Sequence, residues 1–273
     1  MNLLLCTDGT PKSEGALAFG PRLAQSLEAS VTLLGAFEQP AQEAALTATL
    51  ADVCARLTTS GTTCETVLHP MPLRHAVIAQ ATAIAYDLVI VGLTERGRLR
   101  RWLRGPSSRR ILQHVTAPVL VVPFDRPAIR NILLCSGDLW CPAATLEMVQ
   151  RIALSTSAEV TLLYVVPEPQ LNYPILREME DAWGALLQTD TVQGRNLKSC
   201  REALRSQGIE TGIKLRHGPV AEQILTEIRE GEYDMVALGS TYAAQSLRRY
   251  YAPGITDRIV EHAGRPVLVV RHR

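Results

Sequence analysis

Two stretches of the sequence combine residue types that can hold a small charged ligand. The first is Thr7-Asp8-Gly9-Thr10, which follows the apolar run Leu3–Cys6, and the second starts at Gly92 after another apolar run. A carboxylate such as Asp8 accepts hydrogen bonds from ligand hydroxyl groups, although in a turn it also braces the backbone. Glycines let backbone N–H groups approach a phosphate, and a helix N-terminus favours an anion. Together these residues predict a site for a small anionic ligand.

A dense run of basic residues follows Gly92: Arg96, Arg98, Arg100, Arg101, Arg104, Arg109 and Arg110. A solvated surface position is the ordinary state of any single one of these arginines. A phosphate beside the run would gain guanidinium pairs as well as helix amides. The run therefore favours an anion at the same place.

The cysteines and histidines offer weaker chemistry. The six cysteines are scattered without a C-x-x-C pair, and we interpret them as buried thiols rather than as a zinc or redox site. No histidine has a serine or cysteine nucleophile beside it in a recognisable motif, so we expect no catalytic histidine. Ser136-Gly137-Asp138 resembles part of the S-G-G-x-D-S loop of adenylating pyrophosphatases but lacks one glycine and the final serine.

The overall composition excludes several classes of partner. The 273-residue chain carries 28 Lys and Arg against 27 Asp and Glu, a formal net charge of +1, which supplies no field to hold a nucleic-acid backbone or an anionic membrane. No apolar run approaches the ~18 residues that cross a bilayer, and Met1 is followed by Asn2 and three leucines without a basic leader. We expect a soluble cytoplasmic protein that binds neither nucleic acid nor membrane.

An internal repeat organises the chain. The run from Asn2 returns at Asn131 (131 − 2 = 129), and the run from Val31 returns at Val160 (160 − 31 = 129). Tyr86-Asp87 returns as Tyr233-Asp234 (233 − 86 = 147), so the second copy holds 18 extra residues before this point. The runs 118–122 and 266–270 match at an offset of 148, and His114 matches His262 at the same offset, which suggests one shared structural position. We predict two domains, residues 1–124 and 125–273.

Each copy reads as a parallel sheet covered on both faces. In the first copy, short aliphatic runs without polar alternation predict strands near 2–6, 31–37, 64–68, 87–92 and 119–123. Between them we expect a helix that starts with Thr10 as N-cap and Pro11 at its first position, and another whose core-facing stripe is Leu73, Val77, Ala81 and Ile84. The fold class is α/β, with two repeated, doubly wound, five-stranded, Rossmann-like domains. Ligands in such folds lie at the carboxyl ends of the strands.

The last strands of the two copies, 119–122 and 267–270, are both Val-Leu-Val-Val. Each would be an apolar edge, and such edges pair with other strands. We expect the copies to pair through these strands as a pseudo-dimer.

The chain resembles a tandem universal stress protein, and the resemblance extends over nearly all of it. In that family the first strand ends in an Asp that helps to hold adenosine, and the fourth leads into G-x2-G-x9-G-[S/T], whose amides and hydroxyl hold phosphates. Asp8 stands at the Asp position, and Gly92, Glu95, Gly105 and Pro106 stand at the four motif positions. The resemblance implies that ATP or AMP binds in the first copy, with Mg²⁺ entering only with the nucleotide, through the following residues: Thr7, Asp8, Val31, Gly92, Glu95, Arg96, Gly105, Ser107 and Ser108.

The second copy departs further from that motif. Gly137 stands at the Asp8 position, and only Gly239 keeps a motif glycine in place, while Tyr242 would crowd the phosphates. Gly254-Ile255-Thr256 would rebuild part of the phosphate site if the loop absorbs its inserted residue. We expect the second copy to be the weaker nucleotide site.

These features predict a stress-related regulatory protein that binds an adenine nucleotide rather than an enzyme, with any ATP hydrolysis slow and secondary. One alternative is a nucleotide-independent interaction scaffold, which the altered motif favours, and the other is an adenylating enzyme. The expected partners are the nucleotide, a protein of unknown identity and a second copy of the chain.

Replacing Glu95 with glycine tests the motif. A carboxylate near the phosphates repels the ligand in proportion to its charge. Glu95→Gly should therefore raise the affinity for ATP selectively over that for adenosine in calorimetric titration. A loss of ATP affinity would show instead that Glu95 is a ligand or a metal partner.

Overall fold

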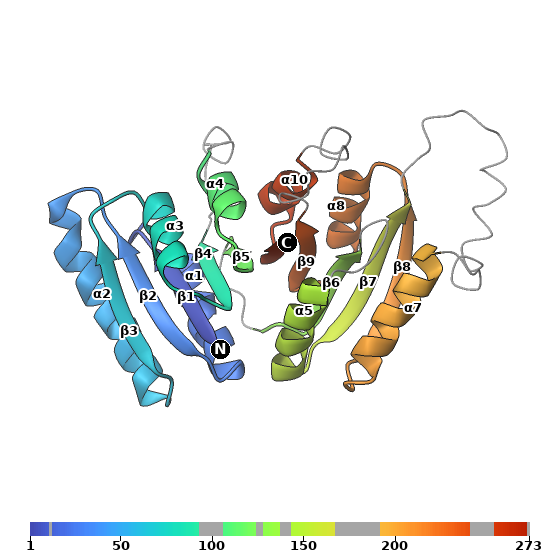
Figure 1. Cartoon of the computed structure of the whole chain (residues 1–273), viewed down its shortest axis with the longest axis horizontal. Coiled ribbons are helices and arrows are strands. Elements are labelled where there is room, and N and C mark those ends of the chain that lie inside the picture. Colours follow the sequence, from blue (N-terminus) through green and yellow to red (C-terminus); the bar gives the residue numbers. More distant parts are fainter. Residues whose placement is uncertain are drawn as a thin grey trace. The chain divides into compact units, whose positions relative to one another are not determined.

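The computed structural model of the chain describes residues 1–10, 13–92, 106–123, 128–136, 143–166, 192–240 and 254–271. By their contacts these residues fall into two compact units. The first comprises Met1–Ala128 together with Gly264–Arg271, and the second comprises Ile129–Ala263. Each unit is described by itself below (Figure 1).

The first unit alternates strands and helices. Its elements are β1 (Asn2–Thr7), α1 (Glu14–Ser26), β2 (Ser30–Ala36), α2 (Pro40–Thr59), β3 (Cys64–His69), α3 (Leu73–Ala83), β4 (Leu88–Gly92), α4 (Pro106–His114) and β5 (Val119–Val122). The strand order is β3-β2-β1-β4-β5, all parallel. Helices α1 and α2 pack against one face and α3 and α4 against the other. The predicted doubly wound α/β fold is confirmed, and its winding reverses between β1 and β4.

The strands of this sheet are apolar because both of its faces are covered. Leu3, Leu4, Leu5, Leu33 and Ile90 have no exposed surface. Burying such side chains contributes about 1.5–3 kcal/mol each. This core fixes the ends of β1 and β4, from which the candidate site extends.

The second unit repeats the pattern. Its elements are β6 (Asn131–Ser136), α5 (Ala143–Thr156), β7 (Glu159–Val166), α7 (Val192–Arg205), β8 (Thr211–His217), α8 (Val220–Glu230), β9 (Met235–Ser240) and α10 (Ile255–His262). The strand order is β9-β6-β7-β8, again parallel. The turn glycines Gly61 and Gly208 both have positive φ and differ by 208 − 61 = 147 positions. The 18 extra residues therefore precede Gly208.

Paired side chains confirm that the two sequence copies share one structure. The carboxylate of Asp87 accepts a hydrogen bond from the Asn2 amide at 2.7 Å, and that of Asp234 accepts one from the Asn131 amide at 3.0 Å. The matched histidines also agree. His114 Nδ1 lies 2.8 Å from the Arg110 carbonyl, and His262 Nδ1 lies 2.9 Å from the Arg258 carbonyl. The prediction of one shared position for these histidines is confirmed.

Two helix predictions were wrong in detail. Helix α1 begins at Glu14, with Ser13 as N-cap, and not after Thr10, because the Ser13 amide donates to the Thr10 carbonyl at 2.9 Å before the helix starts. On α3 the buried residues are Ala76, Val77 and Gln80, whereas Ile84 lies beyond the helix and is 47% exposed. A polar residue, Gln80, takes the place that the apolar pattern assigned to its neighbour Ala81.

The last strand, β10 (Val267–Arg271), is part of the second sequence copy but belongs to the first unit by its contacts. It pairs antiparallel with β5, with Val267 opposite Val121 and Val269 opposite Val119. The predicted pairing of the two Val-Leu-Val-Val runs is confirmed. The apolar edge of β5 is thereby covered by a strand of its own chain.

Lysine in this strand pair should destabilise the protein. Val121 and Val269 are 2% and 1% exposed, so Val121→Lys and Val269→Lys each bury a charge without a partner. We expect each to lower the free energy of unfolding by about 3 kcal/mol or more, measured by thermal melting. Ile84→Lys and Leu154→Lys, at positions 47% and 50% exposed, are matched controls and should melt as the wild type does. Wild-type melting and an unchanged radius of gyration in both edge variants would contradict the pairing.

Candidate functional site

The carboxyl end of β1 carries a tightly bonded acidic turn. Asp8 Oδ1 accepts hydrogen bonds from the Thr10 amide at 3.0 Å, the Thr10 hydroxyl at 2.5 Å and the Ser13 hydroxyl at 2.8 Å. The Asp8 amide in turn donates to the Ser13 hydroxyl at 3.2 Å. Within the described part of the chain, the other oxygen, Oδ2, has no hydrogen-bond donor beside it. The turn therefore braces one carboxylate oxygen and leaves the second for another partner.

The hydroxyl groups of Thr7 and Ser13 form a hydrogen-bonded relay that holds this carboxylate. Thr7 and Ser13 are each 1% exposed, and their hydroxyl oxygens lie 2.7 Å apart. A serine hydroxyl has a single proton, and that of Ser13 has two other acceptors, Asp8 Oδ1 at 2.8 Å and the Thr10 carbonyl at 3.0 Å. When Ser13 donates to either of them, Thr7 is the donor to Ser13. Thr7 Oγ1 also accepts a hydrogen bond from the Gly9 amide at 3.0 Å. The relay holds the Asp8 side chain in one orientation.

Gly92 ends β4 directly beside this turn. A Cβ atom at position 92 would lie 2.7 Å from both the Cα and the carbonyl oxygen of Ser13. That is closer than real Cβ atoms approach backbone, so any side chain at this position would force β4 and the start of α1 apart. The glycine therefore brings the end of β4 against the acidic turn whether or not a ligand binds.

The remaining predicted site residues of the first unit are only partly described. Ser107 and Ser108 lie in the first turn of α4, which follows β4 in the chain, although nothing is described of their side chains. Glu95, Arg96 and Gly105 lie outside the described residues. The structure thus brings Thr7, Asp8 and Gly92 together, whereas residues 93–105 lie outside the described ranges.

The structure does not bring Val31 to this edge. Val31 is buried and pairs with Leu3, near the amino end of β1, and with Cys64. The β2 residue level with Thr7 is Gly35. Val31 lies four residues before Gly35 in β2, so the parallel register places it away from the carboxyl end of β1.

Sequence reasoning missed Ser13, which contacts both Thr7 and Asp8. Its signal is a hydroxyl residue five positions after the acidic residue, at the end of a turn. We did not recognise it because Thr10, which is followed by a proline, is the N-cap that the sequence predicts for this helix in place of Ser13.

The corresponding edge of the second unit is described only at its borders. Ser136 ends β6 at the position of Thr7 (136 − 7 = 129). Gly137 and Tyr242 lie outside the described residues. Gly254 is the N-cap of α10 and has a left-handed backbone with φ 87°. A glycine in this conformation opens the helix that corresponds to α4.

Each unit also holds a buried polar cluster at matching positions, but with different chemistry. In the first, Gln80 Nε2 donates to the Tyr86 hydroxyl at 2.9 Å, and Gln80 Oε1 lies 3.2 Å from His69 Nε2. The residues 147 positions later are Arg216, Glu227 and Tyr233. The central side chain of the first cluster is an uncharged amide, whereas that of the second is a carboxylate.

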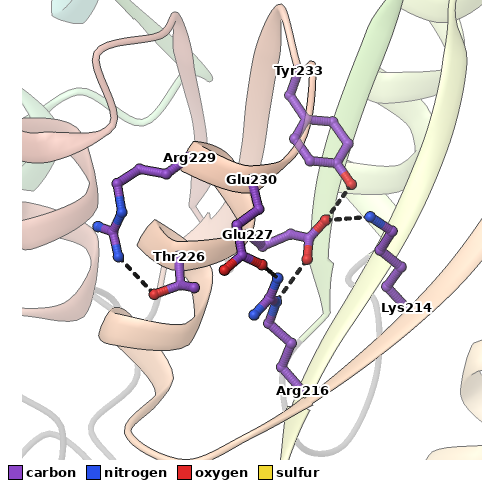
Figure 2. A network of polar contacts seen from close by, with 7 residues as sticks. All are labelled: Lys214, Arg216, Thr226, Glu227, Arg229, Glu230 and Tyr233. Atoms are coloured by element: carbon purple, nitrogen blue, oxygen red, sulfur yellow. Dashed lines mark hydrogen bonds and ion pairs between the residues drawn. The ribbon is translucent and has the colours of Figure 1, made fainter.

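Figure 2 shows that Glu227 on α8 points between two cations of β8. Lys214 Nζ donates to Glu227 Oε1 at 2.7 Å, and Arg216 Nε donates to Oε2 at 2.6 Å. The Tyr233 hydroxyl also donates to Oε1, at 2.6 Å, and Arg216 pairs in addition with Glu230. Every described contact of the Glu227 carboxylate is thus with a donor, as a buried charge requires.

The charges of this cluster depend on one another. Burial raises the pKa of Glu227, but hydrogen bonds from Lys214, Tyr233 and Arg216 outweigh it and hold that pKa below its ordinary value. Burial, and then the Glu227 carboxylate, raise the pKa of Tyr233. Glu227 is therefore ionised at neutral pH although its side chain is only 2% exposed.

Glu227→Gln should lower the free energy of unfolding by about 2–3 kcal/mol at pH 7, measured by urea denaturation, because Arg216 loses its buried partner. The pKa of Glu227 is lower in the folded state than the ordinary 4.5. Its contribution is therefore present above that value and is lost as the pH falls through the folded pKa. The gap between variant and wild type should shrink as the pH falls below 4.5 and through the lower folded pKa.

The double substitution Arg216→His with Glu227→Gln recreates the residues of the first cluster and should recover part of the loss. Equal stability of wild type and Glu227→Gln at pH 7, or a gap that does not change in acid, would contradict this assignment.

Two further features bear on what the site can do. Among the described residues, no group of three His, Cys, Asp or Glu side chains is placed to hold a metal ion. None of the helices in the described ranges is both long enough and apolar enough to span a bilayer.

Comparisons with known proteins agree with this architecture. A universal stress protein from Archaeoglobus fulgidus is similar in structure, with a TM-score of 0.71 at 15% sequence identity, over 99% of this chain and 98% of that one. A putative universal stress protein from Pseudomonas aeruginosa gives 0.72 at 17%, over 99% and 92%. The cytoplasmic domain of a prokaryotic cation chloride cotransporter gives 0.57 at 12%, over 98% and 94%. These likenesses show the fold alone.

No curated protein matches the sequence as a relative. The sequence profile of the universal stress protein family matches the chain twice, over residues 1–123 and 128–271. Both sequence copies carry the match, and together they account for nearly every residue. The chain therefore belongs to the universal stress protein family, as a tandem member with two copies of the fold.

Proposed function

We propose that the first unit binds an adenine nucleotide, ATP or AMP, at the carboxyl ends of β1 and β4, in the service of a stress-related regulatory role. The observation that carries this proposal is the Asp8 carboxylate, which is braced through Oδ1 beside Gly92. Because Oδ1 is held by these bonds, the second oxygen, Oδ2, is fixed in place and can accept hydrogen bonds from ribose hydroxyls without reorganising.

The position of the site in the fold supports a phosphate at the same edge. The winding of the sheet reverses between β1 and β4, and ligands of open α/β sheets lie at such points. Helix α4 starts after the loop that leaves β4, so its N-terminal amides, in the turn that contains Ser107 and Ser108, face the carboxyl edge. The proposed site residues are Thr7, Asp8, Gly92, Glu95, Arg96, Gly105, Ser107 and Ser108.

The second unit is proposed as the weaker site because its sequence has glycine at the Asp8 position. A glycine supplies no carboxylate for the ribose. Mg²⁺ would enter only with the nucleotide phosphates, which carry the oxygens that this ion prefers. We propose binding rather than catalysis, since the described residues of the site offer no general base beyond a carboxylate that is already bonded.

Asp8→Asn in the full-length chain tests the proposal. Asparagine keeps an oxygen for the Thr10 amide and the Ser13 hydroxyl but loses the charge, so the turn should keep its fold. We expect the dissociation constant for ATP or AMP to rise about tenfold or more in calorimetric titration, as the loss of a charged hydrogen bond requires.

Asp87→Asn is the matched control, because Asp87 bonds the Asn2 amide at the other end of β1. It should leave the affinity unchanged. Equal affinities for Asp8→Asn and wild type would contradict the assignment. If the wild-type chain gives no titration heat and releases no nucleotide on heating, the nucleotide-independent scaffold, which Glu95 and Pro106 in the motif favour, takes its place.

A further inference from the structure

Two cysteines of the first unit differ from the others that the structure describes. Cys54 on α2 and Cys64 at the start of β3 are partly exposed, whereas Cys6, Cys135 and Cys200 are buried. The expectation of buried thiols was therefore wrong for this pair. Neither belongs to the proposed nucleotide site, which lies at the opposite end of the strands.

The fold places both thiols between α2 and the sheet. A Cβ atom at Gly35 of β2 would meet Leu46 and Leu50 of α2 and also Leu68 of β3, so Leu68 faces α2. Side chains alternate along a strand, so Cys64 faces α2 as Leu68 does.

Helix α2 presents Cys54 to the same region. Cys54 follows Leu50 by four residues and lies on the same side of the helix. A surface hollow confirms the contact between the two elements here, since it is lined by Cys54 with Ala51, Ala55 and Thr58 from α2 and by Thr66 from β3. Cys54 thus lines the hollow, and Cys64 lies on the edge strand, on the face of the sheet that packs against α2.

The two thiols interact directly. Burial raises the pKa of Cys64 to about 12, and its hydrogen bond with Cys54 and the neighbouring charges of Cys54 and Glu65 contribute to the rise. Cys64 therefore keeps its proton at neutral pH, and its thiol donates to the Glu65 carbonyl at 3.9 Å. Cys54 is the sulfur that can react first, and Cys64 is placed to react second.

We propose that Cys54 and Cys64 form a reversible disulfide when the protein meets a small-molecule disulfide such as oxidised glutathione, which makes the pair a site of oxidative modification. The Cys54 thiolate attacks one glutathione sulfur, the S–S bond breaks and one glutathione thiolate leaves. Cys64 then passes its proton to the departing second glutathione as its sulfur attacks Cys54. Two protein thiols are oxidised by two electrons, and one disulfide is reduced to two thiols.

Such a bond would tie α2 to β3, which is the outer strand of the first unit's sheet. It would close the short segment from 54 to 64 and restrict the unfolded chain. We expect the melting temperature to rise by about 5 °C in the oxidised protein.

The test uses the full-length chain with Cys141→Ser, because Cys141 lies outside the described residues. The native protein is incubated with oxidised glutathione, its remaining thiols are alkylated after denaturation, and intact and digested masses are measured. We expect two thiols to escape alkylation, a mass before alkylation about 2 Da below that of the reduced chain, and a cross-linked peptide that joins Cys54 to Cys64. Dithiothreitol should reverse the change.

The single variants separate the two roles. Cys64→Ser should accumulate glutathione on Cys54, because no second thiol resolves the mixed disulfide. Cys54→Ser should take up little glutathione, because Cys64 stays protonated. The reduced forms of both variants should melt as the parent does, since serine at a partly exposed position costs little.

Three results would overturn the proposal: no loss of thiols in the parent chain, a cross-link between other cysteines, or glutathione uptake that is equal in the two variants.

Discussion

At the carboxyl edge of the first unit, the backbones of β4 and Ser13 come so close that one added carbon at Gly92 would lie 2.7 Å from the Ser13 Cα. This contact fixes where α1 starts relative to β4. Ser13 in turn bonds Asp8 and Thr7, so the orientation of the acidic side chain depends on the same contact. In the nucleotide motif, a glycine at this position lets phosphate approach the backbone. In this fold, Gly92 is also required by the close contact between β4 and Ser13. Its presence is necessary for the site but is not evidence that a ligand occupies it.

The two sequence copies show how one buried position can be satisfied in two ways. Gln80 and Glu227 both occupy the inner face of a helix and both bond a tyrosine that precedes the fourth strand of the copy. A neutral amide needs only neutral partners, whereas the carboxylate of Glu227 requires Lys214 and Arg216. Where the first copy has Gln80 and His69, the second has Glu227 and Arg216, so the charged residue stands beside a charged partner. The two copies keep the same backbone, although an uncharged amide holds one cluster and a charged carboxylate holds the other.

Apolar runs made the strands predictable, because a strand covered on both faces has little freedom in composition. The runs at 2–6 and 119–123 agree with β1 and β5 to within one residue. Polar residues in buried places were not predictable, since Gln80 is inside only because Tyr86 and His69 are there to receive it. Ser13 and the placement of Val31 likewise follow from contacts between segments distant in the chain or hidden in a turn. The local sequence pattern does not predict the contacts of Ser13 or the place of Val31 in the sheet.

The strand β10 has a consequence for the making of the protein. Strand β5 ends at Val122 and its partner begins at Val267, 267 − 122 = 145 residues later. At about 5–20 residues per second, a ribosome takes on the order of ten seconds to supply that length. Throughout this interval the nascent first unit exposes an unpaired apolar edge, to which the same strand from a neighbouring polypeptide would fit equally well. Crowded polysomes carrying this message are thus the setting in which swapped, intertwined products compete with correct intramolecular closure.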